Sequence, residues 1–257
     1  MFFNISTTPA LCCAVLIFFL SPSPAIAQAQ NPVNAAANAP VSADEILRRA
    51  DEIRCPPDSF HMEVEIETKR EKELTKLEVF TRGKDKTRIN TLFPARDRKR
   101  SMIMSGDEMW VYVPNLKRSV LVSLSQKMSG ETAIGDVSRM RWWKDYIPEI
   151  ESEDEKHWIL KLTAARKGLT YDKIISKIEK QTYRPVSAEY RSRSGLLIKT
   201  SRFTEYKKIA DEIRPTVIHF EDARVSSKSS VLRILKIEKR ESPDAFFDPM
   251  QMQASFK

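Results

Sequence analysis

The stretch FHMEVEIE, residues 60–67, alternates apolar and polar side chains without interruption. Successive side chains of a β-strand point to opposite faces, so this period of two places all four apolar residues on one face. The glutamates and His61 fall on the other face, which we expect to meet water. The stretch therefore predicts a half-buried strand and indicates a mainly β protein.

Similar stretches recur along the chain and are separated by short segments of turn-forming residues. The expected strands are 60–67, 74–81, 86–93, 100–104, 109–113, 119–122, 157–163, 171–179, 186–191, 196–206, 216–223 and 230–238. Breaks such as Arg82-Gly83-Lys84-Asp85 and Ser105-Gly106-Asp107 have the composition of tight turns. Eleven or twelve short strands joined in this way predict a large antiparallel meander.

The N-terminal segment carries features of export. Residues 10–20, ALCCAVLIFFL, form an apolar run of signal-peptide length that is short for a bilayer span. The small-x-small triplet Ala25-Ile26-Ala27 predicts cleavage before Gln28, so we expect a signal peptide over 1–27 and a periplasmic location. A short N-terminal anchor is the alternative interpretation.

Residues 28–41 are uncharged and rich in Ala, Asn and Pro, which is typical of a flexible linker. Ser42 and Glu45 then have the spacing of a capping box, and apolar residues follow on one helical face as far as Ile53. We therefore expect a helix that begins at residue 42 and ends before Pro56, and a single domain over 42–257.

The interval 125–151 breaks the alternation but contains Trp142, Trp143 and Tyr146 among polar residues. It is long for a hairpin loop, and loops of this length are usually functional or disordered. Its aromatic and methionine content argues against disorder. We expect one or two short helices here, lying across the sheet.

Residues that catalysis or a cofactor would need are sparse. No two of the six glycines are close enough to form a phosphate-cradling loop, which excludes a Rossmann or P-loop nucleotide-binding site. The three histidines are far apart and form no metal-ligand pattern, so neither a metal site nor another cofactor is expected. Cys55 has no histidine near it in the sequence and is expected to be a packed hydrophobe. These features predict a protein that is not an enzyme.

The formal net charge of +8 falls on residues 44–257, because Asp44 is the first charged residue. An exported basic protein meets anionic lipid headgroups or acidic partner proteins rather than nucleic acid. A merely solvated surface explains the charge equally well. The basic run at residues 96–100 is a candidate headgroup or partner contact.

The stretch RSMIMSGDEMWVYVP, residues 100–114, resembles the LolA-like outer-membrane lipoprotein-sorting family, in which a W-x-Y-x-P strand follows a small Gly/Asp turn. Further similarities follow in order: Gly135-Asp136, Lys167-Gly168-Leu169-Thr170-Tyr171, Tyr183-Arg184-Pro185-Val186, Arg214-Pro215-Thr216 and Glu221-Asp222-Ala223. Together they cover about residues 42–250, as in a distant branch of that family.

This resemblance implies an unclosed, strongly curved antiparallel β-barrel of about 11 strands, with an N-terminal helix and short lid helices over a hydrophobic cavity. It also implies a monomeric periplasmic carrier that binds acyl chains of lipoproteins or other lipids for transfer towards the outer membrane. An inner-membrane transporter would supply the cargo and an outer-membrane acceptor would receive it. In the family an arginine latches the lid, and Arg88 is the candidate here.

Alternation within such a fold supplies candidate ligand-binding residues. The candidate cavity wall is Phe60, Met62, Val64, Ile66, Leu77, Val79, Met102, Met104, Trp110 and Tyr112. The candidate lid is Trp142, Trp143 and Tyr146. Each methylene removed from water contributes about 0.8 kcal/mol, so one chain of roughly 14 carbons would bind substantially.

Other interpretations remain open. The sheet can close on its own core as a sandwich without a cavity. The same fold can serve a non-catalytic periplasmic adaptor or sensor that docks on an inner-membrane transporter of the RND type through its basic loops. An enzyme acting on lipids would require distant residues to converge, and its sign would be a buried titratable pair at the cavity floor.

Overall fold

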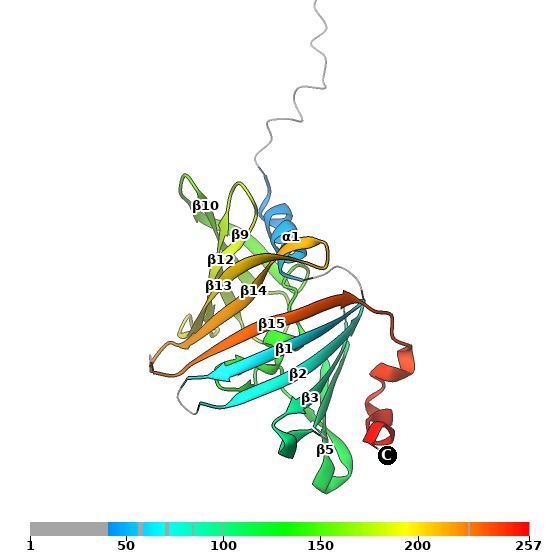
Figure 1. Ribbon diagram of the computed structural model, residues 1–257. Helices are drawn as coiled ribbons and strands as arrows, with labels where there is room; N and C mark the ends of the chain where they lie inside the picture. The colour runs from blue at the N-terminus through cyan, green and yellow to red at the C-terminus, as the bar shows by residue number, and fades with distance from the viewer. Residues whose placement is uncertain are drawn as a thin grey trace, which may run out of the picture. The chain divides into compact units, whose positions relative to one another are not determined.

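The alternating stretches pair into one antiparallel sheet of 13 strands, in the order β6-β5-β4-β3-β2-β1-β15-β14-β13-β12-β11-β10-β9 (Figure 1). This computed structural model describes residues 41–55, 59–69, 72–83, 85–98, 100–225 and 227–256. The strands of the sheet are β1 (Phe60–Thr68), β2 (Leu74–Arg82), β3 (Lys86–Phe93), β4 (Ser101–Ser105), β5 (Glu108–Val113), β6 (Arg118–Val122), β9 (Tyr146–Glu153), β10 (His157–Ala164), β11 (Lys173–Glu179), β12 (Pro185–Arg191), β13 (Leu197–Ile209), β14 (Glu212–Asp222) and β15 (Ser229–Lys239).

Shorter elements lie around this sheet. A two-stranded hairpin consists of β7 (Lys127–Ser129) and β8 (Thr132–Ala133). The α-helices are α1 (Ala43–Arg54) and α2 (Ile134–Ser138). The 3-10 helices are η3 (Ala95–Asp97), η4 (Pro114–Leu116), η5 (Asp244–Phe247) and η6 (Pro249–Phe256).

The sheet is strongly curved and unclosed, since its edge strands β6 and β9 do not pair with each other (Figure 1). The predicted class, a mainly β half-barrel with few helices, is confirmed. The predicted number of about 11 strands is wrong, because the described residues form 15. All the strands that sequence analysis missed lie in or at the end of the interval 125–151.

The sequences of these missed strands show no alternation of apolar and polar residues. The strands β7 and β8 are three and two residues long. The edge strand β9 buries only Tyr146 and leaves most of its side chains exposed, so its apolar residues follow no period of two. The expected short helices reduce to α2, which is five residues long.

The helix α1 forms as its sequence predicts. The Ser42 side chain accepts a hydrogen bond from the Glu45 backbone N–H at 3.2 Å and caps the first turn. The inner face of α1 buries Ile46, Leu47 and Ala50 against the sheet. Cys55, just past the helix, is buried, and burial raises the pKa of its thiol, as suits a packed rather than a reactive cysteine.

The sheet has two apolar faces with separate cores. The larger core takes one face of β1, from Phe60 to Ile66, together with the buried side of α1. On the other face Phe80, Ile103 and Tyr112 pack against Phe247 and Met252 of η5 and η6. The C-terminal segment therefore covers part of the outer face of β2–β6 (Figure 1).

The expectation that His61 faces water is wrong, because the C-terminal segment covers this part of the outer face. The His61 side chain lies on the outer face but is buried, stacked on Phe80 with ring centroids 4.6 Å apart. The carboxylates of Glu78 and Glu238 lie 3.6 and 3.1 Å from its ring nitrogens. Phe80 in turn packs edge-on against Phe246, so an aromatic layer replaces the expected water.

The predicted signal peptide (1–27, cleaved before Gln28) and all of the predicted linker except Val41 lie outside the described residues. Residues 41–257 form one compact unit. None of the helices in the described part of the chain is long and apolar enough to cross a bilayer.

The two-faced sheet makes a simple prediction about Ile66, which is fully buried in the larger core. Ile66→Ala removes packed methylenes and leaves a void, so it should lower the free energy of unfolding by about 2–5 kcal/mol. Ile147→Ala on the edge strand, where the isoleucine is 56% exposed, is the matched control and should change stability little. Urea denaturation followed by circular dichroism measures both, and equal effects would contradict the assignment of the core face.

Candidate functional site

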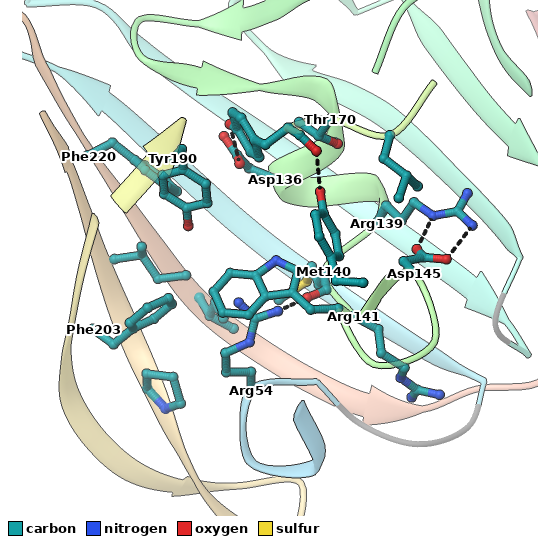
Figure 2. Close-up of a pocket in the computed structure, with 18 residues that line it drawn as sticks. Arg54, Asp136, Arg139, Met140, Arg141, Asp145, Thr170, Tyr190, Phe203 and Phe220 are labelled. Carbon is teal, nitrogen blue, oxygen red and sulfur yellow. Dashed lines mark hydrogen bonds and ion pairs between the residues drawn. The ribbon is translucent and has the colours of Figure 1, made fainter. Parts of the chain in front are cut away.

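A pocket opens where the end of α1, the segment 139–146 and the inner face of β12–β15 converge (Figure 2). Its empty volume is about 590 Å³, including the open mouth. The walls are mainly aromatic and aliphatic: Trp142, Tyr146, Tyr190, Phe203, Ile218 and Phe220. This lining, and not the free volume at rest, is what the pocket shares with small-molecule and acyl-chain sites.

The Asp51 carboxylate is the polar centre beneath the pocket. Its Oδ2 accepts hydrogen bonds from the backbone N–H groups of Trp142, at 2.6 Å, and Trp143. The side chain is buried, and burial raises the pKa of Asp51, while the Arg54 charge and the two backbone N–H groups act in the opposite direction. The helix α1 thereby holds the segment 139–146 through its main chain.

Arg54 completes this attachment from the next turn of α1. Its guanidinium donates to the Met140 carbonyl oxygen and lies 3.3 Å from Asp51 Oδ1. The same group sits 3.4 Å from the centroid of the Trp142 ring, in a cation–π contact. We call Asp51, Arg54 and Trp142 the latch.

A second set of ion pairs holds the far end of the segment 139–146. Arg139 Nη2 lies 3.1 Å from Asp145 Oδ1, and Arg139 also donates to the Gly106 carbonyl oxygen at 2.9 Å. Arg166 joins Asp145 (2.9 Å) to Asp107 (2.7 Å), and its hydrogen bond holds the pKa of Asp107 below the ordinary value. The segment is therefore held in its middle by α1 and at its two ends by the turns β4–β5 and β10–β11.

The floor of the pocket contains a buried charge pair. Lys199 Nζ donates to Asp136 Oδ2 and, at 2.8 Å, to the Glu131 carbonyl oxygen. The Tyr171 hydroxyl donates to Asp136 Oδ1 at 2.8 Å. Burial lowers the pKa of Lys199, opposed by Asp136, and burial raises the pKa of Tyr171.

This pair is of the kind that the enzyme interpretation would require, but its bonding is that of a structural pair. Asp136 is engaged through both oxygens, since Oδ2 also accepts the Ala133 backbone N–H at 2.7 Å. The Lys199 ammonium is further enclosed by the rings of Tyr171, Tyr190 and Phe220 at 4.3–5.2 Å. A charge that is fully hydrogen-bonded in this way is positioned to fix the fold rather than to attack a substrate.

Two of the sequence motifs meet at this floor. Gly135 packs so closely on Thr170 that a Cβ would collide with the threonine side chain. Asp136 and Tyr171, the next residues of each motif, form the hydrogen bond described above. The close approach of α2 to the β10–β11 turn therefore requires glycine at position 135.

The predicted lid residues lie at this site, although none is in a helix. Trp142 and Tyr146 line the main pocket, and Trp143 lines a neighbouring one together with Phe60. The other predicted wall residues of the inner face are packed in the larger core and do not line the main pocket: Met62, Val64, Ile66, Leu77, Val79, Met102 and Met104. Their side chains fill the space that the sequence analysis assigned to a cavity.

Trp110 and Tyr112 do not belong to that wall. Both lie on the outer face, in the smaller core with Phe247 and Met252 of the C-terminal segment. Met109 and Val111 of β5 point inward instead. The inward-facing residues of β5 are therefore shifted by one position from those that the sequence analysis assumed.

Arg88 is also wrong as the lid latch. Its guanidinium donates to the Phe246 carbonyl oxygen at 3.1 Å and stacks on the Phe246 ring, on the outer face. The arginine that holds the segment 139–146 to α1 is Arg54. Its signal was present in the sequence, since Leu47, Asp51 and Arg54 share one helical face and a charged pair on an apolar face requires buried partners.

Comparisons with known proteins agree with this fold. A family model described as "-like: Uncharacterized protein" matches residues 83–254. None of the curated proteins matches the chain significantly. A LolA superfamily protein from Nitrosomonas europaea is 36% identical with a TM-score of 0.77, and the match covers 81% of this chain and 98% of that one.

Two more distant structures share the fold alone. A domain from Vibrio parahaemolyticus assigned to outer membrane lipoprotein sorting is 20% identical, with a TM-score of 0.67 over 82% of this chain and 98% of that one. A DUF1329 family protein from Desulfovibrio piger is 18% identical, with a TM-score of 0.68 over 80% and 95% of the two chains.

The latch predicts an asymmetry between single and double substitution. Arg54→Ala leaves the Asp51 carboxylate buried without its cation and should lower the free energy of unfolding by about 3–5 kcal/mol. The double variant Asp51→Asn/Arg54→Met should be less destabilised than the sum of its single variants, because the two groups share one interaction. Arg48→Ala on the exposed side of α1 is the control and should leave stability nearly unchanged. Chemical denaturation measures all five variants, which are Arg54→Ala, Asp51→Asn, Arg54→Met, the double variant and the control, and strict additivity of the pair would contradict the latch.

Proposed function

The chain belongs to the LolA superfamily, and we propose that it is a non-catalytic periplasmic carrier that binds acyl chains of lipoproteins or other lipids in the main pocket. In this proposal the protein acts as a monomer, takes its cargo from an inner-membrane transporter and passes it to an acceptor towards the outer membrane. The observation that carries the proposal is an apolar pocket closed by a latched segment.

The chemistry of the pocket suits an acyl chain. Its walls offer edge-on rings, with Trp142 lying 6.3 Å from Tyr190 and 6.4 Å from Phe203 between ring centroids. The tyrosine hydroxyls that reach it are already satisfied, since Tyr146 donates to the Tyr171 carbonyl oxygen at 3.1 Å and Tyr190 pairs with Ser201. An apolar ligand would therefore displace no unpaired polar group.

The segment 139–146 suits the role of a lid. It packs on the pocket through Trp142 and Tyr146, and polar contacts hold it at both ends. Polar contacts of this kind can exchange for water when the segment moves, whereas a purely apolar lid would expose its core to water on opening. Cargo entry is then an opening at the latch and not a rearrangement of the sheet.

A second candidate is the periplasmic adaptor that docks on an inner-membrane transporter without carrying cargo. The filled inner core favours it, because seven of the predicted cavity-wall residues are packed against one another. The two candidates differ in whether the pocket enlarges to accept lipid. Detection of bound lipid therefore distinguishes the carrier from the adaptor directly.

Native mass spectrometry of the gently purified protein, with extracted lipids identified in parallel, tests the carrier. The protein should retain lipid or take up added fatty-acyl ligand. Ile218→Phe adds bulk inside the pocket and should reduce uptake several-fold while keeping the wall apolar.

Leu235→Phe is the matched control, because Leu235 is 51% exposed on neighbouring β15 and should not affect uptake. A protein that is empty as purified and takes up no added lipid would overturn the carrier and leave the adaptor as the better account.

A further inference from the structure

The antiparallel meander gathers alternate turns at one end of the strands. Four of them are neighbours along that end: 69–73 between β1 and β2, 92–98 at and after the end of β3, 192–198 from the end of β12 into the start of β13, and 223–228 between β14 and β15. We call the described residues of these turns the basic rim. Part of it forms the left edge of Figure 1, at the tip of the β14–β15 hairpin.

Contacts between successive turns make the basic rim continuous. The Ala223 backbone N–H donates to the Ile198 carbonyl oxygen at 3.1 Å, which joins the β14–β15 and β12–β13 turns. The Lys69 backbone N–H donates to the Ser229 carbonyl oxygen at 3.0 Å, which joins β14–β15 to β1–β2. An ion pair between Arg96 and Glu73 extends the line to the turn after β3.

Cations dominate this rim. The following exposed rim residues form no ion pair with a carboxylate of the described chain: Lys69, Lys72, Arg98 and Arg224. The side chain of Arg193 is 74% exposed and has only Asp172, at 3.7 Å, as a partner. Several positive charges on the rim therefore face solvent without a carboxylate partner among the described residues.

The described carboxylates in the rim and directly beside it are already engaged. Glu73 and Asp97 both lie beside Arg96. Asp222 accepts the backbone N–H groups of Arg224 and Val225 at 2.9 and 3.0 Å, which shapes the turn. The rim thus keeps its positive excess, whereas the opposite end of the sheet is mixed, with acidic turns such as 153–155 and basic ones such as 180–184.

Large apolar side chains stand among these cations. The exposed fractions are 41% for Leu92, 43% for Phe93, 52% for Leu196, 42% for Ile198 and 38% for Val225. Apolar tips interleaved with Lys and Arg match the boundary between anionic headgroups and acyl chains. An acidic protein surface would satisfy the charges but offers no matching apolar layer for five separate tips.

We propose that the basic rim docks the protein on the surface of a bilayer that contains anionic phospholipid. The apolar tips enter the headgroup boundary and the cations contact phosphate groups. This inference goes beyond the carrier function, because it assigns the surface on which the protein rests, and no rim residue lines the main pocket.

Flotation of the purified protein with vesicles tests the rim. The protein should bind vesicles of equal parts phosphatidylglycerol and phosphatidylcholine at low salt, at least tenfold more tightly than pure phosphatidylcholine. Raising the salt should weaken this binding. Lys72→Ser/Arg224→Ser should weaken it about 25-fold, on the basis of about fivefold per basic residue near an anionic surface. Leu196→Ser/Ile198→Ser should weaken binding at least tenfold.

Matched controls lie at the opposite end of the sheet. Lys156→Ser removes an exposed lysine there, and Ile213→Ser removes an isoleucine that is 45% exposed. Both should bind vesicles as the unchanged protein does, and circular dichroism checks that every variant is folded.

Absence of binding to the phosphatidylglycerol vesicles would overturn the rim as a membrane surface and would be the result expected of a site for an acidic protein. Equal weakening by the control variants would overturn it as well. The pocket variant Ile218→Phe separates this inference from the carrier, because it should lose lipid uptake and keep vesicle binding.

Discussion

The arrangement around the pocket depends on one buried carboxylate. Asp51 receives two backbone N–H groups of the segment 139–146, while Arg54 neutralises it and covers the Trp142 ring. A buried charge of this kind is tolerated only with near-complete bonding, so each partner constrains the others. The position of α1 on the sheet, the path of the segment and the orientation of the indole are therefore set together.

The sheet uses its two faces for different purposes. The inner face carries the larger core, the latch and the charged floor of Asp136 and Lys199. The outer face is closed near β2–β6 by η5 and η6, which Arg88 holds through the Phe246 carbonyl oxygen. An aromatic layer on the outside stiffens those strands without occupying the inside. The two faces thus divide the sheet: β2–β6 are packed on both sides, whereas the inner face of β12–β15 lines the main pocket.

Much of the fold follows from local pattern, and the site does not. Period-two alternation located twelve strands and the Ser42 cap located α1, since both signals depend on neighbouring residues only. Alternation cannot say which face of β5 turns inward, so Trp110 and Tyr112 were assigned to the wrong side. The pairing of Asp136 with Lys199 joins positions 63 residues apart through the topology of the sheet. A contact between positions so far apart cannot be predicted from a short stretch of sequence. The charged pair on the apolar face of α1, in contrast, could be recognised from the helix sequence alone.

Two free energies decide how a latched carrier could still take up its cargo: the cost of opening the latch and the gain from burying an acyl chain. Opening the latch exposes a charge pair whose disruption costs about 3–5 kcal/mol while the groups remain buried, and less once water reaches them. Burying acyl methylenes returns about 0.8 kcal/mol each. About four methylenes therefore offset the lower cost and about six the upper one, and a longer chain leaves a surplus that holds the lid over its cargo. Short amphiphiles would not reach this threshold. In the proposed carrier the latch would therefore act as a length filter, and cargo would fit only once the segment 139–146 has moved away from the pocket.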